Sequence, residues 1–365
     1  MPDKRAHLSE DRLKELLQAK ELNELELDEL VRLFRGEASL QEHLPSGRYA
    51  VDPRFGSRVL FNPSRARRPH DQIPAATNQG EAAETCPICR GNTTGVVDRA
   101  QLSAGYTFIN KNLYPMLYPF ESDDDLARGL HFLQWTSSYH NRDWHNLPAA
   151  DRPLVLGRLA ALERKLISGR NPFAAGSDSG PYVSIIKNRG TIVGASLSHG
   201  HQQIAVSNVM PGWTAANARF EQAQGVPFSQ FVLKSAPASL MIRDYGQAVL
   251  LVPPFMKRPY DMLLVNKDPS KAYLHQLDAA ELAAIADGWH EATRAIHSVL
   301  GRMGREIAYN VLVSNGPGAG LYLEFLPYSQ ITGGYEHLGL YVCQSIPEMA
   351  AEDLRQALDE PMEQS

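Results

Sequence analysis

One run of small and polar residues, from Gly194 to Ile204, constrains this chain more than any other feature. If the run continues as a β-strand, side chains alternate between its two faces, so His199, His201 and Gln203 share one face and Ile204 lies on the other. Such a strand brings two imidazoles and one neutral amide to a single place. We therefore expect the chemistry of the protein to be centred on this run.

A His-x-His pair on a strand has more than one interpretation. Both rings can bind one metal ion, or one ring binds a metal while the other reacts. Alternatively, both are hydrogen-bonded histidines of a partly exposed strand. Small neighbours such as Gly194, Ser196 and Gly200 favour a ligand, because they let it approach the backbone and place hydroxyl and amide donors where an anion would lie.

Composition limits the class of protein. A chain of 365 residues with 43% hydrophobic content is expected to form two ordinary domains or one bilobed unit with a sizeable core. No stretch approaches the roughly eighteen apolar residues that span a bilayer, and the N-terminus leads into a charged helix instead of a signal core. A formal charge of -5 with scattered Lys and Arg argues against nucleic-acid binding. We expect a cytoplasmic protein without a membrane partner.

A Cys-x-x-Cys pair, Cys86 and Cys89, is a candidate metal site. In a cytoplasmic protein this spacing suits tetrahedral zinc, but two thiolates are only half of the ligand set. The remaining ligands must come from distant positions, for which the candidates are His140 and one histidine of the central pair. The alternative is a cysteine turn without metal.

Three arginines within four residues, Arg65, Arg67 and Arg68, follow a short predicted strand. They could clamp phosphate groups with paired hydrogen bonds, or they could form a solvated loop. The sequence alone leaves both interpretations open.

Hydrophobic periodicity predicts both helices and strands. Leucines at helical spacing predict a two-helix arm over residues 1–45 that packs on the body or on a partner subunit. A hairpin of short strands is expected near residues 48–61. The remaining predicted helices cover 153–168, 213–224 and 279–300, the last with Asp278 as N-cap and Glu281 in a capping box. A strand that leaves into an aromatic, proline-ended loop is expected over 107–115. The remaining predicted strands cover 130–135, 182–187, 249–252, 262–265, 308–313 and 321–326.

The order of these motifs resembles the galactose-1-phosphate uridylyltransferase branch of the histidine-triad superfamily, over about Arg48 to Leu358. The motifs that carry the resemblance are Asn62 to Pro69, Cys86 to Asn92, Phe108 to Pro115, the strand that ends at His140, Asn188, and Gly194 to Gln203. The resemblance implies an α+β fold with two histidine-triad-like lobes, each an antiparallel sheet with packed helices. The expected domains are the helical arm 1–45, a lobe 46–212 with the metal and the nucleophile, and a lobe 213–365.

The resemblance also implies specific roles for residues of the two central motifs. Cys86, Cys89, His140 and His199 would bind one structural zinc ion per chain, and His201 would be the nucleophile that carries a nucleotide covalently. Gln203 would donate a hydrogen bond to a phosphoryl oxygen. Nucleotide and phosphate contacts are expected from Arg65, Arg68, Asn110, Asn188 and Ser196, and sugar hydroxyl contacts from Glu336.

Departures from the usual family motif bear on the substrate. Uridylyltransferases of this branch usually have His-Pro-His-Gly-Gln, whereas this chain has Gly200 between its histidines and Ser198 before them. This form is similar to the ADP-glucose phosphorylase type. Tyr322-Leu323-Glu324 stands where a second metal site has a His-x-His pair, so we expect no second metal. A lysine that typically meets the sugar phosphate is replaced near Gln330.

We therefore predict a nucleotidyltransferase that moves a nucleoside monophosphate from a nucleoside diphosphate sugar to phosphate or a sugar 1-phosphate. One alternative is a true hexose-1-phosphate uridylyltransferase. An alternative of another class is a zinc-containing nucleotide-binding protein without catalytic activity. As the family often forms dimers, the resemblance also implies a homodimer.

Overall fold

The computed structural model describes residues 7–19, 21–68, 85–121, 125–168, 172–173 and 180–360. The chain forms two compact units that interleave along the sequence. The first unit comprises Met1–Asp143, Leu154–Ile185 and Ser196–Ala216, and the second comprises Trp144–Pro153, Ile186–Ala195 and Asn217–Ser365. The domain division at residues 45/46 and 212/213 stays a prediction.

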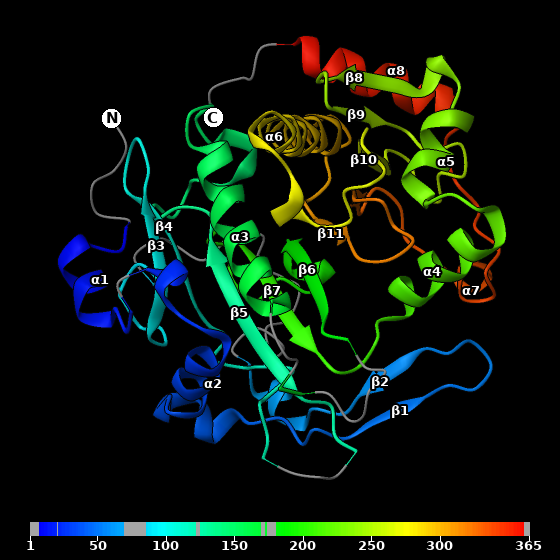
Figure 1. The fold of residues 1–365 in the computed structure, drawn as a ribbon. Coiled ribbons are helices and arrows are strands. Elements are labelled where there is room, and N and C mark those ends of the chain that lie inside the picture. Colours follow the sequence, from blue (N-terminus) through cyan, green and yellow to red (C-terminus); the bar gives the residue numbers. More distant parts are fainter. Residues whose placement is uncertain are drawn as a thin grey trace. The chain divides into compact units, whose positions relative to one another are not determined.

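The first unit begins with the helical arm that the leucine spacing predicts. Ser9 caps helix α1 (Glu10–Leu16) by accepting a hydrogen bond from a backbone N–H of its first turn. Helix α2 (Leu27–Arg35) starts with a capping box and buries four apolar side chains along one face. Both helices lie beside the strands of the same unit (Figure 1). Short 3₁₀ helices at Leu22–Glu24 and Ala38–His43 complete the arm.

Most strands belong to one ten-stranded sheet, with hydrogen-bonded neighbours in the order β3-β4-β5-β7-β6-β11-β12-β10-β9-β8. Those of the first unit are β3 (Val96–Gln101), β4 (Tyr106–Lys111), β5 (Gly129–Trp135) and β7 (His201–Ser207), and β6 (Tyr182–Arg189) contributes residues to both units. The pairs β3–β4, β4–β5 and β5–β7 are antiparallel. Helix α3 (Arg152–Ile167) and a separate hairpin, β1 (Tyr49–Val51) and β2 (Arg58–Leu60), confirm two further predicted elements.

The pairing of β5 with β7 decides which side chains share a face. Trp135 pairs with His201 and Leu133 with Gln203, so these four side chains lie on one face of the sheet. Strand β7 begins only at His201, because the backbone before it turns toward the cysteines. The expectation that His199 lies inside the strand is therefore wrong, whereas the shared face of His201 and Gln203 is confirmed.

The opposite face of the same two strands holds a buried polar network. Gln202 donates its amide to Gln134 Oε1 at 2.7 Å and accepts from the Thr136 hydroxyl at 3.1 Å. Gln134 in turn donates to the backbone oxygen of Val155 in α3 at 2.8 Å. Because buried amides are costly unless they are hydrogen-bonded, this network fixes the register that presents His201 and Gln203 on the other face.

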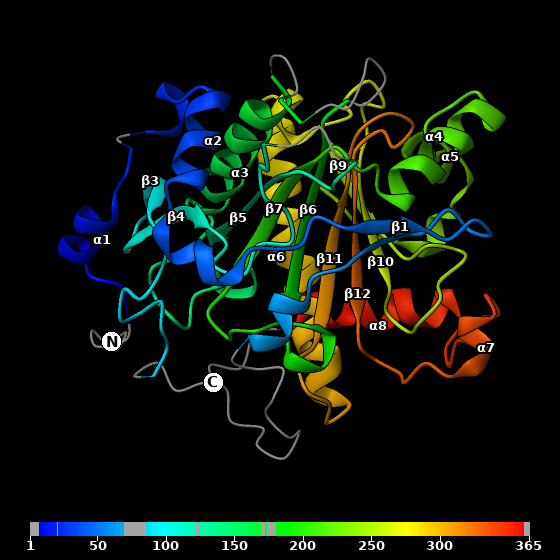
Figure 2. The same ribbon diagram turned by 90° about the horizontal axis from the view of Figure 1, so that it is seen from below.

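The second unit contains its own strands and helices. Asp278 caps the long helix α6 and shares a capping box with Glu281, as the sequence predicts. Helix α8 packs on α6 (Figure 2). The strands are β8 (Met241–Asp244), β9 (Ala248–Leu251), β10 (Met262–Asn266), β11 (Tyr309–Ser314) and β12 (Tyr322–Pro327). The helices are α4 (Gly212–Gln224), of which residues to Ala216 belong to the first unit, α5 (Phe228–Ser235), α6 (Ala279–Arg302), α7 (Gly334–His337) and α8 (Pro347–Asp359).

The structure confirms the α+β class, since helices accompany a large antiparallel sheet. The strand order by itself does not separate two sheets, so the description as two histidine-triad-like lobes stays a prediction. Within the described residues, no helix has both the length and the apolar character needed to cross a bilayer.

Candidate metal centre and reactive face

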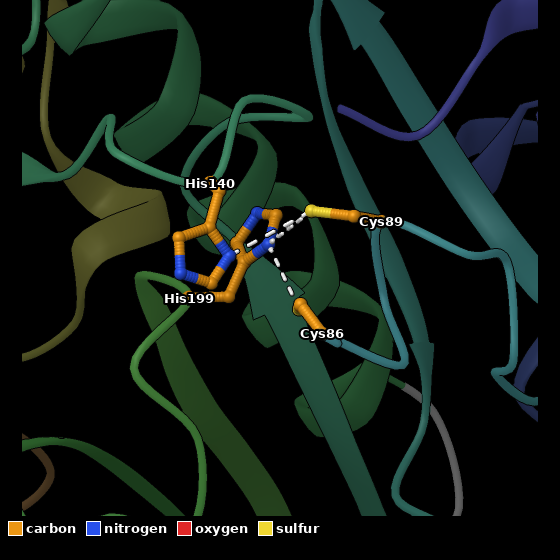
Figure 3. Close-up of side chains that lie close together, drawn as sticks. All are labelled: Cys86, Cys89, His140 and His199. Atoms are coloured by element: carbon orange, nitrogen blue, oxygen red, sulfur yellow. Dashed lines mark hydrogen bonds between the residues drawn. The ribbon is translucent and has the colours of Figure 1, made fainter. Parts of the chain in front are cut away.

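Four side chains from three distant segments converge in the first unit, and we call them the metal cluster: Cys86, Cys89, His140 and His199 (Figure 3). Their candidate ligand atoms all lie within 4.8 Å of one another. His199 Nδ1 is 3.7 Å from Cys86 Sγ and 3.6 Å from Cys89 Sγ, while His140 Nδ1 is 3.7 Å from Cys89 Sγ. The structure thus brings together all four residues that the resemblance implies.

These distances fit a tetrahedral zinc ion. With usual Zn–S and Zn–N bond lengths, a tetrahedron places sulfur and nitrogen ligands about 3.6 Å apart. The chemistry of the donors agrees, because the hydrogen bond with Cys89 and the neighbouring His140 and His199 lower the pKa of Cys86 to about 2. A thiolate is the form that binds metal. The metal cluster could therefore hold zinc through two thiolates and two imidazole Nδ1 atoms.

The orientation of His199 is fixed by its backbone surroundings. Its Nε2 lies 2.8 Å from the Ser137 carbonyl oxygen, which can only accept a hydrogen bond. The ring proton therefore sits on Nε2, and the Nδ1 lone pair points to the sulfur atoms. This is the arrangement in which a second hydrogen bond orients a metal-binding histidine.

The N-terminal arm packs directly against the metal cluster. Leu8 and Leu13 belong to the same buried apolar group as Cys86, Ile88 and Trp135. The backbone N–H of Gln18 donates to Val96 O at 2.9 Å, and that of Leu8 donates to Ser138 O at 3.2 Å. The sequence leaves open whether the arm packs on the body of the protein or on a partner subunit. The structure shows the arm packed on the body.

Two glycines and one buried ion pair hold the arm in this position. A Cβ atom at Gly91 would lie 2.5 Å from Arg12 Cγ, and one at Gly95 would lie 2.1 Å from Gln18 Cδ, so a side chain at either glycine would displace the side chain of the arm that packs there. Lys111 is completely buried and its Nζ lies 2.9 Å from a carboxylate oxygen of Glu37. A buried charge that loses its partner is strongly destabilising, so this pair requires the arm to be in place.

The side chains that we call the reactive face lie on β5 and β7: His131, Trp135, His201 and Gln203. His201 is buried, and its Nδ1 lies 2.9 Å from the His199 carbonyl oxygen. Because that oxygen can only accept, the proton of the neutral ring sits on Nδ1 and the lone pair sits on Nε2. The geometry thus specifies which nitrogen of His201 carries the lone pair, and the role of His201 as nucleophile stays a prediction.

Trp135 is the member of the reactive face that also contacts the metal cluster. Its ring centroid is 5.3 Å from that of His199 and 4.8 Å from that of His201. Asn110 accepts a hydrogen bond from Trp135 Nε1 at 2.7 Å and donates to Thr94 Oγ1 at 2.8 Å. In this structure Asn110 holds Trp135 in place, and its contact with a nucleotide stays a prediction.

Gln203 has a partner that sequence reasoning missed. Its Oε1 lies 3.0 Å from Nε2 of His131, a buried histidine two residue pairs further along the β5–β7 ladder. The sequence places His131 in the predicted strand 130–135 without a role. Period-two alternation puts His131 on the same face of β5 as Trp135, and the missing signal was the pairing register of β5 with β7.

The two predicted phosphate-binding arginines lie near His131. Arg65 is in a 3₁₀ helix (Pro63–Arg67) and donates to the Tyr114 carbonyl oxygen at 2.7 Å, and Arg68 follows as the C-cap. The positive charges of Arg65 and Arg68 both lower the pKa of His131, after the larger effect of burial. Pro69, the end of that motif, lies outside the described residues.

The remaining predicted contacts are distributed over both units. In the second unit, Asn188 Oδ1 accepts from the Asn310 amide at 2.9 Å. Glu336 accepts from the backbone N–H of Gly333 at 2.7 Å and of Val342 at 3.2 Å, and these bonds lower its pKa. Ser196 is half-buried in the first unit. The roles of these residues stay predictions.

The departure at Gly200 has a structural reason. A Cβ atom at this position would lie 2.5 Å from Cγ of Asp143, which accepts a hydrogen bond from Thr136. Proline or any residue with a side chain would therefore overlap Asp143. Gly200 also supports the start of β7, because its carbonyl oxygen accepts from the Thr136 N–H at 3.0 Å.

The other departures lie in the second unit. The hydroxyl of Tyr322, which is buried, donates to Asn217 Oδ1 at 3.1 Å. Gln330 donates to the Val342 carbonyl oxygen and accepts from the backbone N–H of Gln344, so its side chain holds the segment after α7.

Comparison with known sequences finds two kinds of relative, although no family model matches the chain. The chain is 23% identical over 340 residues to an ADP-glucose phosphorylase of Arabidopsis thaliana, a match that covers 84% of this chain and 91% of that protein. It is 24% identical over 263 residues to a galactose-1-phosphate uridylyltransferase of Cryptococcus neoformans, covering 64% and 67% of the two chains.

Solved structures of the same two kinds share the fold. A uridylyltransferase structure matches with a TM-score of 0.65 and 20% identity, covering 85% of this chain and 98% of that chain. The Arabidopsis ADP-glucose phosphorylase with bound ADP-glucose matches with a TM-score of 0.63 and 19% identity, with the same coverage of the two chains. The chain is therefore similar in sequence to an ADP-glucose phosphorylase and to a galactose-1-phosphate uridylyltransferase, and it shares the fold of solved structures of both kinds.

Proposed function

We propose that this protein is a nucleotidyltransferase that moves a nucleoside monophosphate from a nucleoside diphosphate sugar to phosphate or to a sugar 1-phosphate, through a covalent nucleotidyl-His201. The observation that carries this proposal is the hydrogen bond from His201 Nδ1 to the His199 carbonyl oxygen. This bond places the lone pair of His201 on Nε2. Gln203, two residues further along the same face of β7, carries an amide that can donate to a phosphoryl oxygen. The likeness to an ADP-glucose phosphorylase over 84% of the chain supports the phosphorylase form.

The reaction divides into two displacements at phosphorus. In the first, Nε2 of neutral His201 attacks the α-phosphorus, an N–P bond forms, and the P–O bond to the departing sugar 1-phosphate breaks. In the second, an oxygen of the acceptor phosphate attacks the same phosphorus, the N–P bond breaks, and neutral His201 is restored. The imidazole becomes cationic in between, and the Nδ1–H bond to the His199 carbonyl stabilises that charge.

The surrounding residues would bind and orient the phosphoryl group. Gln203 would donate its amide to one non-bridging oxygen, and Ser196 with Arg65 or Arg68 would compensate the charge on the others. An amide stabilises that oxygen without the deep electrostatic well of a lysine, so the intermediate can still react onward. Asn110 and Asn188 are proposed to contact the nucleotide, and Glu336 the sugar.

We propose that the metal cluster binds one zinc ion per chain with a structural role. When bound, zinc supplies a fixed anchor for its ligands and takes no part in bond making. His199 would then hold the first residue of β7 so that His201 is oriented before substrate binds. Because two reduced thiols are needed, a cytoplasmic location fits this proposal.

Intact-protein mass spectrometry tests the covalent step. After brief incubation with separate UDP-, ADP- and GDP-sugars, we expect a mass gain of one nucleoside monophosphate with at least one donor. His201→Ala should abolish the gain, whereas His337→Ala in the second unit should retain it. The donor that gives the adduct also identifies the base. An adduct that persists in His201→Ala would overturn the assignment of the nucleophile.

The second candidate, a hexose-1-phosphate uridylyltransferase, is favoured by the match to the Cryptococcus protein and by the uridylyltransferase structure. The two candidates differ in the acceptor. Supplying UDP-glucose with galactose 1-phosphate, and in parallel with phosphate alone, separates them. Exchange with the hexose phosphate supports the uridylyltransferase, and release of glucose 1-phosphate by phosphate supports the phosphorylase. Tight nucleotide binding without turnover on any donor would instead support the inactive binding protein.

We also propose a homodimer. Apolar side chains along the segment after β12 are unusually exposed, and a surface of this kind favours association with a second copy. They are Ile331, Tyr335, Leu338, Leu340, Tyr341, Val342, Ile346 and Met349. Light scattering should give twice the chain mass, and Leu338→Glu combined with Leu340→Glu should give the monomer. A dimer unaffected by both changes would place the interface elsewhere.

A further inference from the structure

The environment of His131 determines its proton position without any assumption about substrate. The backbone N–H of Met116 points at His131 Nδ1 over 3.1 Å. A backbone N–H can only donate, so Nδ1 must be the acceptor nitrogen of the ring. In a neutral imidazole the proton then sits on Nε2, and Nε2–H can only donate.

The proton on Nε2 in turn determines the orientation of Gln203. The Gln203 atom that faces Nε2 at 3.0 Å must be an acceptor, which is the amide oxygen Oε1. The amide nitrogen, with both of its protons, therefore points away from His131. Asn112 Oδ1 accepts from the Tyr114 N–H at 2.9 Å, which leaves the donor nitrogen of this amide 3.3 Å from the same Nε2. An Nε2–H cannot accept from it, so Gln203 Oε1, which is closer, holds the hydrogen bond to Nε2.

Two features keep His131 neutral. The residue is 1% exposed, and burial lowers its pKa to about 3, with a further contribution from the positive charge of Arg65. A protonated ring would also carry hydrogen on Nδ1, facing the Met116 N–H. His131 therefore keeps one tautomer over the whole physiological pH range.

We infer that His131 is a positioning residue that sets the orientation of the Gln203 amide, so that its NH₂ group is presented to the phosphoryl group transferred to His201. This inference rests on the proposed function for the identity of the ligand, although the orientation itself does not. A free glutamine amide can rotate by half a turn at little cost, and the rotated form would present its oxygen to an anionic phosphate. Fixing the amide before binding removes this unproductive form.

The kinetic test compares two substitutions of the same residue. His131→Gln places an amide near the position of Nε2 and can still donate to Gln203. His131→Asn reaches only the position of Nδ1 and loses that donor. We expect His131→Asn to slow formation of the nucleotidyl-His201 adduct by about 10- to 100-fold, less than the about 100- to 1000-fold typical of removing a donor to a transition state, because Gln203 is still present. His131→Gln should stay within about threefold of wild type, with nucleotide affinity and zinc content unchanged in both.

A double-mutant cycle separates positioning from a general structural role. In a Gln203→Ala background there is no amide to orient, so adding His131→Asn should cause no further loss of rate. If His131→Asn slows Gln203→Ala as much as it slows wild type, the inference is wrong. Equal loss in His131→Asn and His131→Gln would also contradict it.

A measurement without catalysis tests the proton assignment. Two-bond ¹⁵N–¹H spectra of histidine-labelled protein should show His131 as the neutral Nε2–H tautomer from pH 5 to pH 8. An Nδ1–H tautomer, or an imidazolium at pH 6, would overturn the inference. If wild type forms no adduct with any donor, the proposed function fails while these spectra still decide the inference.

Discussion

The metal cluster and the reactive face are neighbours joined through Trp135 and the His199 carbonyl, yet they are built in different ways. The four side chains of the metal cluster lie at the distances of a tetrahedral zinc site, and the arm packs over them. The reactive face presents His201 and Gln203 in orientations that the protein itself determines. The expected phosphate ligands Arg65 and Arg68 lie near it without meeting at one point.

This difference indicates what each region does before substrate arrives. A cluster whose donors already match zinc needs no rearrangement to bind it, which fits the proposed structural role of holding neighbouring residues. The reactive face fixes the lone pair of His201 and the amide of Gln203, and under the proposed function the substrate would complete the remaining contacts. Backbone hydrogen bonds determine the proton position of each histidine. The Ser137 and His199 carbonyl oxygens can only accept, so the protons lie on His199 Nε2 and His201 Nδ1. The Met116 N–H can only donate, so the proton of His131 lies on Nε2.

The largest expected effect comes from removing a metal ligand. Cys86→Ser or Cys89→Ser should release about one zinc ion per chain and lower the melting temperature by about 10 °C or more, because a structural zinc contributes folding energy directly. Elemental analysis and calorimetry measure both quantities. Cys343→Ser, at a free cysteine of the second unit, is the matched control. Full metal content and unchanged melting in both ligand variants would refute the zinc assignment.

The arm offers the next test, since it covers the metal cluster. Leu13→Ala should lower the free energy of unfolding by about 2–5 kcal/mol, because it leaves a cavity in the apolar group that contains Cys86. It should also accelerate zinc transfer to a coloured chelator. Leu154→Ala, at a leucine that is 46% exposed, should change neither quantity. Equal chelation rates in both variants would show that the arm does not protect the metal.

Gly200 lies where the two regions meet, and its substitution tests their connection. Gly200→Ala should cost about 1–3 kcal/mol of stability, because its Cβ overlaps Asp143. Asp143→Gly in the same chain should restore part of the loss. Gly212→Ala, where a Cβ meets nothing within 4 Å, is the control. Denaturant unfolding measures the stability of wild type, the two single variants and the double variant. If the double variant loses as much stability as Gly200→Ala, overlap with Asp143 is not the cause.

The smallest effect concerns the pH dependence of stability. His131 has a folded-state pKa of about 3 against 6.5 for the unfolded chain, so below pH 6.5 the unfolded state takes up a proton that the folded state does not. Stability should therefore fall by about 1 kcal/mol from this residue between pH 6.5 and pH 5.5, and return as the pH rises. His131→Gln should lack this pH-dependent loss of stability, so denaturant unfolding should show a smaller decrease between pH 6.5 and pH 5.5 than in wild type. Parallel pH curves for the two proteins would contradict the assignment.

Local patterns were sufficient for much of the fold. Helix α6 with its Asp278 cap, the hairpin of β1 and β2, and the shared face of His201 and Gln203 all follow from spacing and capping rules. The cysteine pair is recognisable by its spacing and His140 could be named as a candidate partner, but the choice of His199 over His201 came only from the resemblance. No local rule connects residues that are more than fifty positions apart.

The remaining features depend on register and on close packing. His131 meets Gln203 only because β5 and β7 pair with Leu133 opposite Gln203, and periodicity does not determine pairing register. The strand start at His201 likewise depends on His199 turning to the cysteines. Asn110 was assigned by motif alone, whereas its bond to Trp135 is a tertiary contact that the motif could not reveal.

The wide sequence separation of the metal ligands has a consequence for how the protein is made. Cys86 and Cys89 leave the ribosome more than a hundred residues before His199, and the arm leaves still earlier. Until His199 has emerged, a bound ion can have at most three of its four protein ligands, and the two thiols are open to oxidation or to other metals. If the cluster binds zinc as proposed, the site is completed only when the chain reaches β7, and a chain truncated before His199 would hold the ion with at most three of its protein ligands.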